Sequence, residues 1–118
     1  MKSVFELDVF KLAHEVTLRI YRLSAQWPIE ERYGLTSQMR RSASSINMNL
    51  SEGSARRTGK DIRHFVTMAL GSSREFSYQA MLARDLGYLD ADAFNALFKD
   101  CDRIEKMLYK LHASIKSA

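Results

Sequence analysis

The 118-residue sequence has few of the residues that interrupt regular structure and few that cross-link a chain. It contains one proline and five glycines, so it lacks the frequent turn signals that a fold of many short strands needs. Its one cysteine, Cys101, excludes an intramolecular disulfide framework and a multi-cysteine zinc site. We therefore expect a few long helices in a reducing compartment, stabilised by packing alone.

Long hydrophobic runs are also missing. No stretch approaches the roughly 18 consecutive apolar residues of a membrane span. The first residues become acidic at Glu6, where a secretory signal peptide is apolar. Hydrophobic residues make up 46% and charged residues 27%, a balance typical of a folded domain rather than a disordered chain. These features predict one cytoplasmic domain that spans residues 1–118.

Two segments in the first half carry apolar residues at the three- and four-residue spacing of an amphipathic helix. The first spans about residues 8–26 and ends before Pro28, because proline disfavours helix in the residue that precedes it. The second follows Gly34, and we expect Gly53 to act as its C-cap. The predicted buried residues are Val9, Leu12, Ala13, Val16, Ile20 and Leu23 in the first helix, and Met39, Ala43, Ile46 and Leu50 in the second.

Two longer helices are predicted in the second half. Thr58 to Asp61 resembles a capping box at the start of the third helix, which ends at Gly87, and Asp90 caps the fourth. Gly71, in the middle of the third helix, is expected to allow close helix packing. The predicted buried residues are Ile62, Phe65, Ala69, Ser72, Phe76, Gln79, Ala83 and Leu86, then Phe94, Leu97, Cys101, Ile104, Leu108, Leu111 and Ile115. Short connections between four amphipathic helices predict an all-α fold, an antiparallel up-down-up-down four-helix bundle.

Several apolar side chains fall outside these stripes. On the third helix, Val66, Leu70 and Met81 lie about 120° from the predicted stripe, at about 100° per residue. On the second helix, Met48 lies roughly opposite the stripe. Single exposed apolar residues are ordinary, but several on different helices suggest contact between subunits. We therefore expect a homo-oligomer with these four residues at its interface.

The net charge of +4 is concentrated in one part of the sequence. Between residues 32 and 64, seven basic residues stand against two acidic ones, a local charge of +5, and six of the seven are arginine. A solvated helix face rich in arginine is one interpretation. Guanidinium groups also match phosphates bidentately and stack on bases, which favours a phosphate-rich partner. The candidate nucleic-acid-binding residues are Arg40, Arg41, Arg56, Arg57, Lys60 and Arg63.

No catalytic or metal-binding motif is recognisable. His14, His64 and His112 stand on three different predicted helices, without the paired spacing of a zinc-binding helix. Cys101 lies in a predicted core stripe, where a thiol behaves as a small hydrophobic group. The acidic residues fall in a loop, at a helix cap and on a solvated face. We therefore expect no enzymatic activity, no metal and no cofactor.

Residues 33–43, YGLTSQMRRSA, resemble the four-helix-bundle proteins encoded in intervening sequences of bacterial 23S ribosomal RNA genes. The resemblance extends over Ser45-Ile46, Asn49, Glu52-Gly53, Arg63, Phe65, Ala69–Ser72, Glu75, Gln79, Leu82-Ala83 and Leu86–Leu89. It implies a homopentamer, similar to the accessory variability protein of diversity-generating retroelements, which binds nucleic acid and a reverse transcriptase. The sequence departs from the family at Asn47-Met48, where Pro-Ser is usual.

Two functional hypotheses follow. The first is a non-enzymatic oligomer that binds RNA or DNA, with low sequence specificity, through a basic surface from the second helix to the start of the third. The second is a protein-interaction scaffold whose charge serves an acidic protein partner, for example a reverse transcriptase. Arg40 and Arg41 are equally compatible with a structural role, pairing with Glu52 or Glu75.

Overall fold

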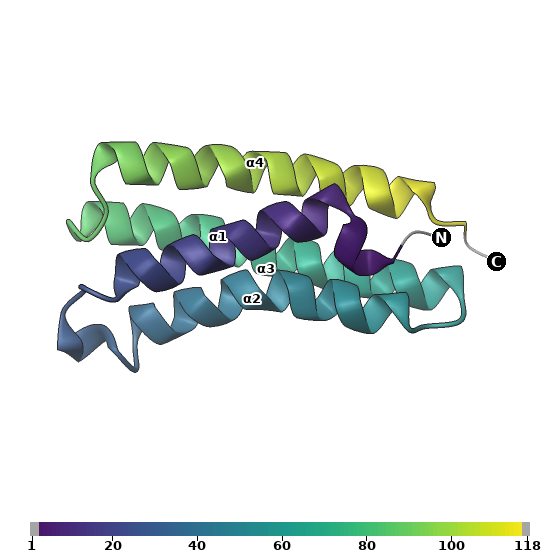
Figure 1. Ribbon diagram of the computed structural model, residues 1–118, viewed down its shortest axis with the longest axis horizontal. Helices are drawn as coiled ribbons and strands as arrows, with labels where there is room; N and C mark the ends of the chain where they lie inside the picture. The colour runs from purple at the N-terminus through teal and green to yellow at the C-terminus, as the bar shows by residue number, and fades with distance from the viewer. Residues whose placement is uncertain (1–2, 117–118) are drawn as a thin grey trace.

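Four α-helices make up most of the computed structural model, which describes residues 3–116 (Figure 1). They are α1 (Asp8–Ser24), α2 (Leu35–Ser54), α3 (Gly59–Asp85) and α4 (Ala91–Ser114), with short 3-10 helices η1 (Val4–Glu6) and η2 (Ile29–Glu31). Within residues 3–116 the chain forms no strand. The fold is therefore all-α with four helices, as the sequence predicts.

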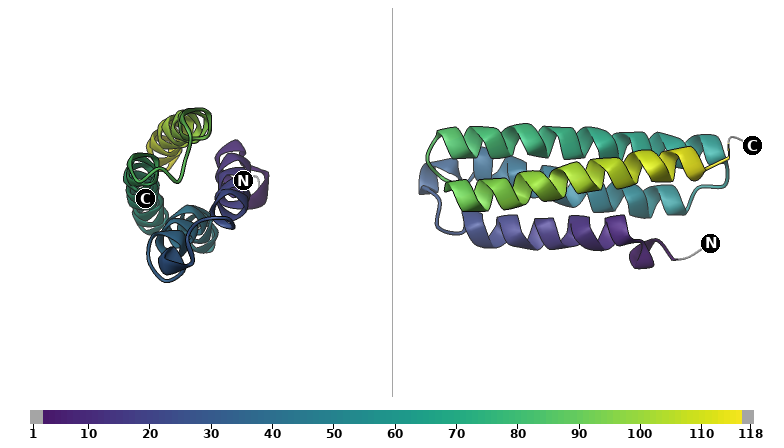
Figure 2. Two further views of the ribbon diagram at one scale, coloured as in Figure 1. Left: turned by 90° about the vertical axis from the view of Figure 1, so that its left-hand side faces the viewer. Right: turned by 90° about the horizontal axis from the view of Figure 1, so that it is seen from above.

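The four helices lie side by side along the long axis of the molecule, which measures 47 × 25 × 20 Å (Figures 1 and 2). α1 packs against α2, α2 against α3, and α3 against α4, while α4 also contacts α1. The most extensive of these contacts joins α2 to α3, and the least extensive joins α1 to α4. In the described part of the chain, no helix is both long enough and apolar enough to cross a membrane.

The predicted stripes of α1, α2 and α4 are confirmed. Their residues are buried, except that Leu23, Leu111 and Ile115 are half-buried at the helix ends. The two predicted N-caps are also confirmed, because the Thr58 hydroxyl accepts a hydrogen bond from the amide of Asp61 (3.1 Å) at the start of α3. At the start of α4, the Asp90 carboxylate accepts one from the amide of Ala93 (2.8 Å). Apolar stripes therefore define α1, α2 and α4, and side-chain caps mark the starts of α3 and α4.

The predicted stripe of α3 is partly wrong. Leu86 is 49% exposed, whereas Val66, predicted at a subunit interface, is only 2% exposed and belongs to the core. The buried residues of α3 are Gly59, Val66, Ala69, Ser73, Phe76, Gln79, Ala80 and Ala83. Because α3 packs against both α2 and α4, its buried arc is rotated from the predicted stripe and includes small residues. Val66 is therefore not available for contact with another subunit.

A single carboxylate links the two loops at one end of the molecule. Glu31 accepts hydrogen bonds from the Leu35 amide at the start of α2 (3.2 Å) and from the Tyr88 hydroxyl beyond α3 (2.9 Å). The bond to Glu31 raises the pKa of Tyr88 above its ordinary value. A Cβ atom on Gly34 would lie 2.9 Å from the Glu31 carboxylate oxygen. Glycine at position 34 thus leaves room for the carboxylate that joins these loops.

Two of the glycines within helices, Gly53 and Gly71, do not have the roles predicted for them. Gly53, predicted as a C-cap, lies within the last turn of α2, where an added Cβ would be 2.8 Å from the Cβ of Phe65. Gly71, predicted at a close helix contact, is exposed, and an added Cβ would meet no atom within 4 Å. Gly53 is therefore the glycine that lets α3 approach α2 closely.

Alanine at these two positions is expected to change stability in opposite directions. Gly53→Ala overpacks the contact with Phe65 and should lower the free energy of unfolding by about 1–3 kcal/mol. Gly71→Ala removes backbone freedom from an exposed helical position and should raise it by about 0.5–1 kcal/mol. Urea unfolding of both variants is the measurement, with Gly71→Ala as the control for helix propensity. Unchanged stability in Gly53→Ala would contradict the close contact.

Candidate nucleic-acid interface

The six predicted nucleic-acid-binding residues fall into two separate groups. Arg56, Arg57, Lys60 and Arg63 surround the turn between α2 and α3, and we call these four the end cluster. Arg40 and Arg41 lie in the first half of α2. Arg41 and Arg56 are separated by about 22 Å of helix, at 1.5 Å per residue. One chain therefore places the predicted residues at two locations rather than close together.

Two members of the end cluster are held by contacts within the chain. Arg56 pairs with Glu52 (2.8 Å), and its guanidinium carbon lies 4.7 Å from the centre of the Phe65 ring. Arg63 donates a hydrogen bond from Nη1 to the backbone carbonyl of Ile115 (3.2 Å), which ties α3 to the end of α4. Packing therefore fixes the position of both guanidinium groups.

The other two members of the end cluster are free to reach a ligand. Arg57 and Lys60 are exposed, and neither forms an ion pair within residues 3–116. Long cationic side chains of this kind can turn toward a phosphate without losing an internal contact. The end cluster thus combines two fixed cations with two adaptable ones.

Two further features raise the positive potential at this end of the molecule. The N-terminus of α3 follows Thr58 and contributes the positive end of its helix dipole. Lys116 is exposed and directly follows Ile115, whose carbonyl binds Arg63. Lys116 was not among the residues predicted from the sequence, because its proximity to Arg63 results only from the packing of α4 on α3.

Arg40 has a structural role at the opposite end of α2. Its Nε donates to the hydroxyl of the buried Ser24 (2.9 Å) and its Nη2 to the Tyr21 carbonyl (3.3 Å). The guanidinium carbon also lies 4.5 Å from the centre of the Tyr21 ring. These contacts join α2 to the end of α1. The partners of Arg40 are therefore Ser24 and Tyr21 rather than the predicted Glu52 or Glu75.

Arg41 lines a hollow of about 280 Å³ between α2 and α3. We call this hollow the polar groove, and it is lined by Gln38, Arg41, Ser42, Ser45, Ser72 and Glu75. Ser72 donates a hydrogen bond to Ser45 (3.0 Å), and the buried Ser42 donates one to Gln79 (2.6 Å). All of these residues belong to the motifs that carry the family resemblance. Two motif segments that are distant in the sequence therefore meet at the polar groove.

Exposed apolar side chains flank the polar groove. Met48 lies on the same face of α2 as Arg41, seven residues further along, and is 64% exposed. On α3, Met68 precedes Ser72 by one turn and Leu82 follows on the same face, and both are exposed. Apolar side chains therefore stand on both α2 and α3 beside the polar groove.

The other predicted interface residues lie elsewhere. Leu70 is half-buried and packs against the core, and Val66 is part of the core. Met81 is exposed, but it lies on a different face of α3 from the polar groove. Of the four predicted residues, only Met48 borders the groove.

Two further groups, Asp100 and Cys101, are engaged in the fold. Asp100, predicted on a solvated face, pairs with Arg19 of α1 (2.6 Å) and with Arg103 (3.2 Å). Burial raises the pKa of the Cys101 thiol to about 11, so the thiol stays protonated near neutral pH. In the part of the chain that the structure describes, no three His, Cys, Asp or Glu side chains are grouped so as to hold a metal ion.

These features define a small all-α protein of four packed helices with a basic end. The chain belongs to the family of 23S rRNA-intervening sequence proteins, whose model matches residues 5–110. The family resemblance found in the sequence is thus confirmed.

A solved structure has a similar fold. It is a protein of unknown function from the S23 ribosomal protein family of Bacteroides thetaiotaomicron, with a TM-score of 0.80 and 21% identity. The match covers 90% of this chain and 99% of that chain. At this identity the likeness supports the fold alone. The sequence matches no curated protein.

The neighbouring arginines Arg40 and Arg41 should differ in their effect on stability. Arg40→Ala removes two hydrogen bonds and a ring contact next to a buried hydroxyl, so we expect a loss of about 1–3 kcal/mol. Arg41→Ala removes an exposed side chain and should change the free energy of unfolding by less than about 0.5 kcal/mol. Urea unfolding of both variants tests this difference. Equal effects would rule out a specific structural role for Arg40.

Proposed function

We propose that this chain is a non-enzymatic helical protein that binds RNA or DNA through the end cluster, with low sequence specificity. The observation that carries the proposal is that Arg57 and Lys60 are exposed beside the fixed Arg63, without an ion pair in residues 3–116. Cations that neutralise backbone phosphates release counterions, which yields affinity independent of base sequence.

We also propose that the chains assemble through the polar groove into a homo-oligomer, a pentamer as the family resemblance implies. Arg41 and Glu75 line the same groove, and neither forms an ion pair within residues 3–116, so each is available to a second copy. Met48 and Met68 supply apolar contact at its borders. Assembly would place several copies of the end cluster on one particle. Weak phosphate contacts at each copy would then raise the overall affinity through a high effective concentration.

Each subunit in this proposal is an antiparallel up-down-up-down bundle. The connections between α2 and α3 and between α3 and α4 contain only a few residues. Such short connections favour antiparallel packing of consecutive helices. The end cluster would then lie at the same end of every subunit.

An alternative function is a scaffold for another protein. The exposed Met48, Met68 and Leu82 support it, because apolar side chains around a polar groove can bind a partner chain as well as a second copy. An acidic partner, for example a reverse transcriptase, would also be attracted by the end cluster. This alternative predicts no binding of free polynucleotide at physiological salt.

Polynucleotide binding is expected to depend steeply on salt. Fluorescence anisotropy with mixed-sequence RNA and DNA oligonucleotides should show affinity falling strongly between about 50 and 200 mM salt. In the variant Arg57→Ala/Lys60→Ala, the slope of log affinity against log salt should become shallower by about 1–2. These residues make no internal ion pair within residues 3–116, so the variant should keep the stability of the original chain.

The matched control removes the same charge elsewhere. Arg22→Ala/Lys99→Ala alters two exposed cations on α1 and α4, outside the end cluster. The control should keep most of the affinity of the original chain. An equal loss of affinity in both double variants would mean that net charge alone, and not the end cluster, determines binding. If the original chain binds no polynucleotide at the lower salt concentration, the protein scaffold is favoured.

The oligomer is expected to depend on the α2 side of the polar groove. Light scattering should give a particle of several times the 13.6 kDa chain mass, five times for a pentamer. Met48→Glu places a charge at the groove border and should reduce this mass. Tyr109→Glu, on the exposed side of α4, is the control and should leave it unchanged. A monomeric original chain, or equal masses for all three proteins, would contradict the proposed interface.

A further inference from the structure

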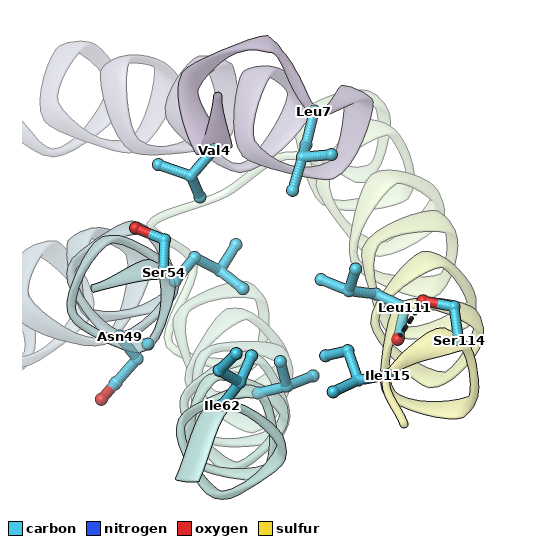
Figure 3. Close-up of a pocket in the computed structure, with 11 residues that line it drawn as sticks. Val4, Leu7, Asn49, Ser54, Ile62, Leu111, Ser114 and Ile115 are labelled. Atoms are coloured by element: carbon cyan, nitrogen blue, oxygen red, sulfur yellow. Dashed lines mark hydrogen bonds between the residues drawn. The ribbon is translucent and has the colours of Figure 1, made fainter. Parts of the chain in front are cut away.

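An apolar hollow of about 480 Å³ lies at the end of the molecule that carries the end cluster. We call it the end pocket. Its walls come from four parts of the chain, and Figure 3 shows their side chains facing one another across the hollow. Its apolar walls include Val4, Leu7, Ile62, Leu111 and Ile115. Its volume lies within the range of about 300–1,000 Å³ that is typical of small-molecule sites.

The polar side chains at the border of the end pocket do not offer hydrogen bonds to its interior. Asn49 donates to the Ser45 carbonyl (2.9 Å), and Ser114 donates to the Leu111 carbonyl (2.6 Å). The Ser54 hydroxyl is bound to its own helix in the same way. Figure 3 shows the polar atoms of Asn49 and Ser54 turned away from the hollow. The interior is therefore hydrocarbon, and a polar ligand such as a sugar would leave its hydroxyls unpaired there.

Positive charge stands at the edge of this hydrocarbon interior. The Arg63 guanidinium binds the carbonyl of Ile115, a wall residue, and Arg63 follows the wall residue Ile62. Lys116 follows Ile115 and is exposed. Neither Arg63 nor Lys116 forms an ion pair within residues 3–116. An apolar interior with a cationic edge is complementary to a molecule with a hydrocarbon tail and an anionic head.

We propose that the end pocket binds a single-chain amphiphilic carboxylate, with its alkyl chain among the apolar side chains and its carboxylate at Arg63. The guanidinium has further N–H groups besides the one bound to Ile115, and a carboxylate accepts two of them in parallel. The alkyl chain needs no hydrogen bonds, which matches the apolar walls. This site goes beyond the proposed nucleic-acid binding. It shares Arg63 with the end cluster, but polynucleotide does not need to enter the apolar interior.

The first experiment uses the full chain and three probes. Calorimetric titration with sodium decanoate below its micelle concentration should give saturable binding at one molecule per chain and a raised melting temperature. Acetate lacks the tail, and decyltrimethylammonium carries the same tail with opposite charge, so both should bind at least about tenfold more weakly. Equal binding of decanoate and decyltrimethylammonium would overturn the role of the cationic edge.

Two variants and a spectroscopic measurement locate the site. Arg63→Gln should weaken decanoate binding about tenfold, whereas Arg57→Gln, an exposed member of the end cluster, should change it less than about twofold. In methyl NMR spectra, decanoate should shift the signals of Ile62, Leu111 and Ile115 and leave that of the distant core residue Ile20 unchanged. Equal weakening in both variants, or shifts outside the end pocket, would overturn the assignment.

The competing occupant of the end pocket is a second copy of the chain. The particle mass from light scattering, measured with and without decanoate, distinguishes a bound small molecule from a second copy. An unchanged particle mass with bound decanoate supports the small-molecule site. A mass that falls as decanoate is added would assign the end pocket to a contact between copies and overturn the proposal.

Discussion

The close packing of α2 against α3 is the contact on which the other features depend. At its end, Gly53 leaves room for Phe65, and near its middle the buried Ser42 donates a hydrogen bond to Gln79. A buried hydrogen bond between two helices favours one register, because a shifted register would leave both groups unpaired. Small residues along this contact also let the two helices approach closely, so larger side chains would not fit between them. The polar groove, the end cluster and the end pocket all lie along this pair of helices.

This packing also divides the cations of the end cluster into two kinds. Phe65, which covers Gly53, also lies beneath the guanidinium of Arg56, and Arg63 is tied to the end of α4. These two charges are therefore positioned before any ligand arrives, which lowers the entropy cost of binding. Arg57 and Lys60 are exposed near the turn, and their side chains can adjust to different spacings between the phosphates of a ligand. In the proposed nucleic-acid binding, fixed and adaptable cations together would contact the phosphate backbone rather than a particular base sequence.

Most of the fold could be predicted because its signals are local. Helix caps at Thr58 and Asp90 depend on residues three positions apart, and the stripes of α1, α2 and α4 consist of bulky apolar residues. α3 was harder, since its buried residues include the small Ala69, Ser73 and Ala80, while the bulky Met68 and Leu82 are exposed. A stripe chosen by hydrophobicity alone is therefore only partly correct on that helix.

The sequence by itself determined the helical class, the approximate extents of the helices, the family and the excess of arginine between residues 32 and 64. The tertiary structure decided that Arg40 is structural, that Val66 is core, and that Lys116 lies near Arg63. Only the packed helices show that Gly53 lies at the close contact between α2 and α3, and that an apolar pocket forms at the end of the molecule. Periodicity and caps act over a few neighbouring residues, whereas these outcomes depend on side chains from distant segments that meet only when the helices pack.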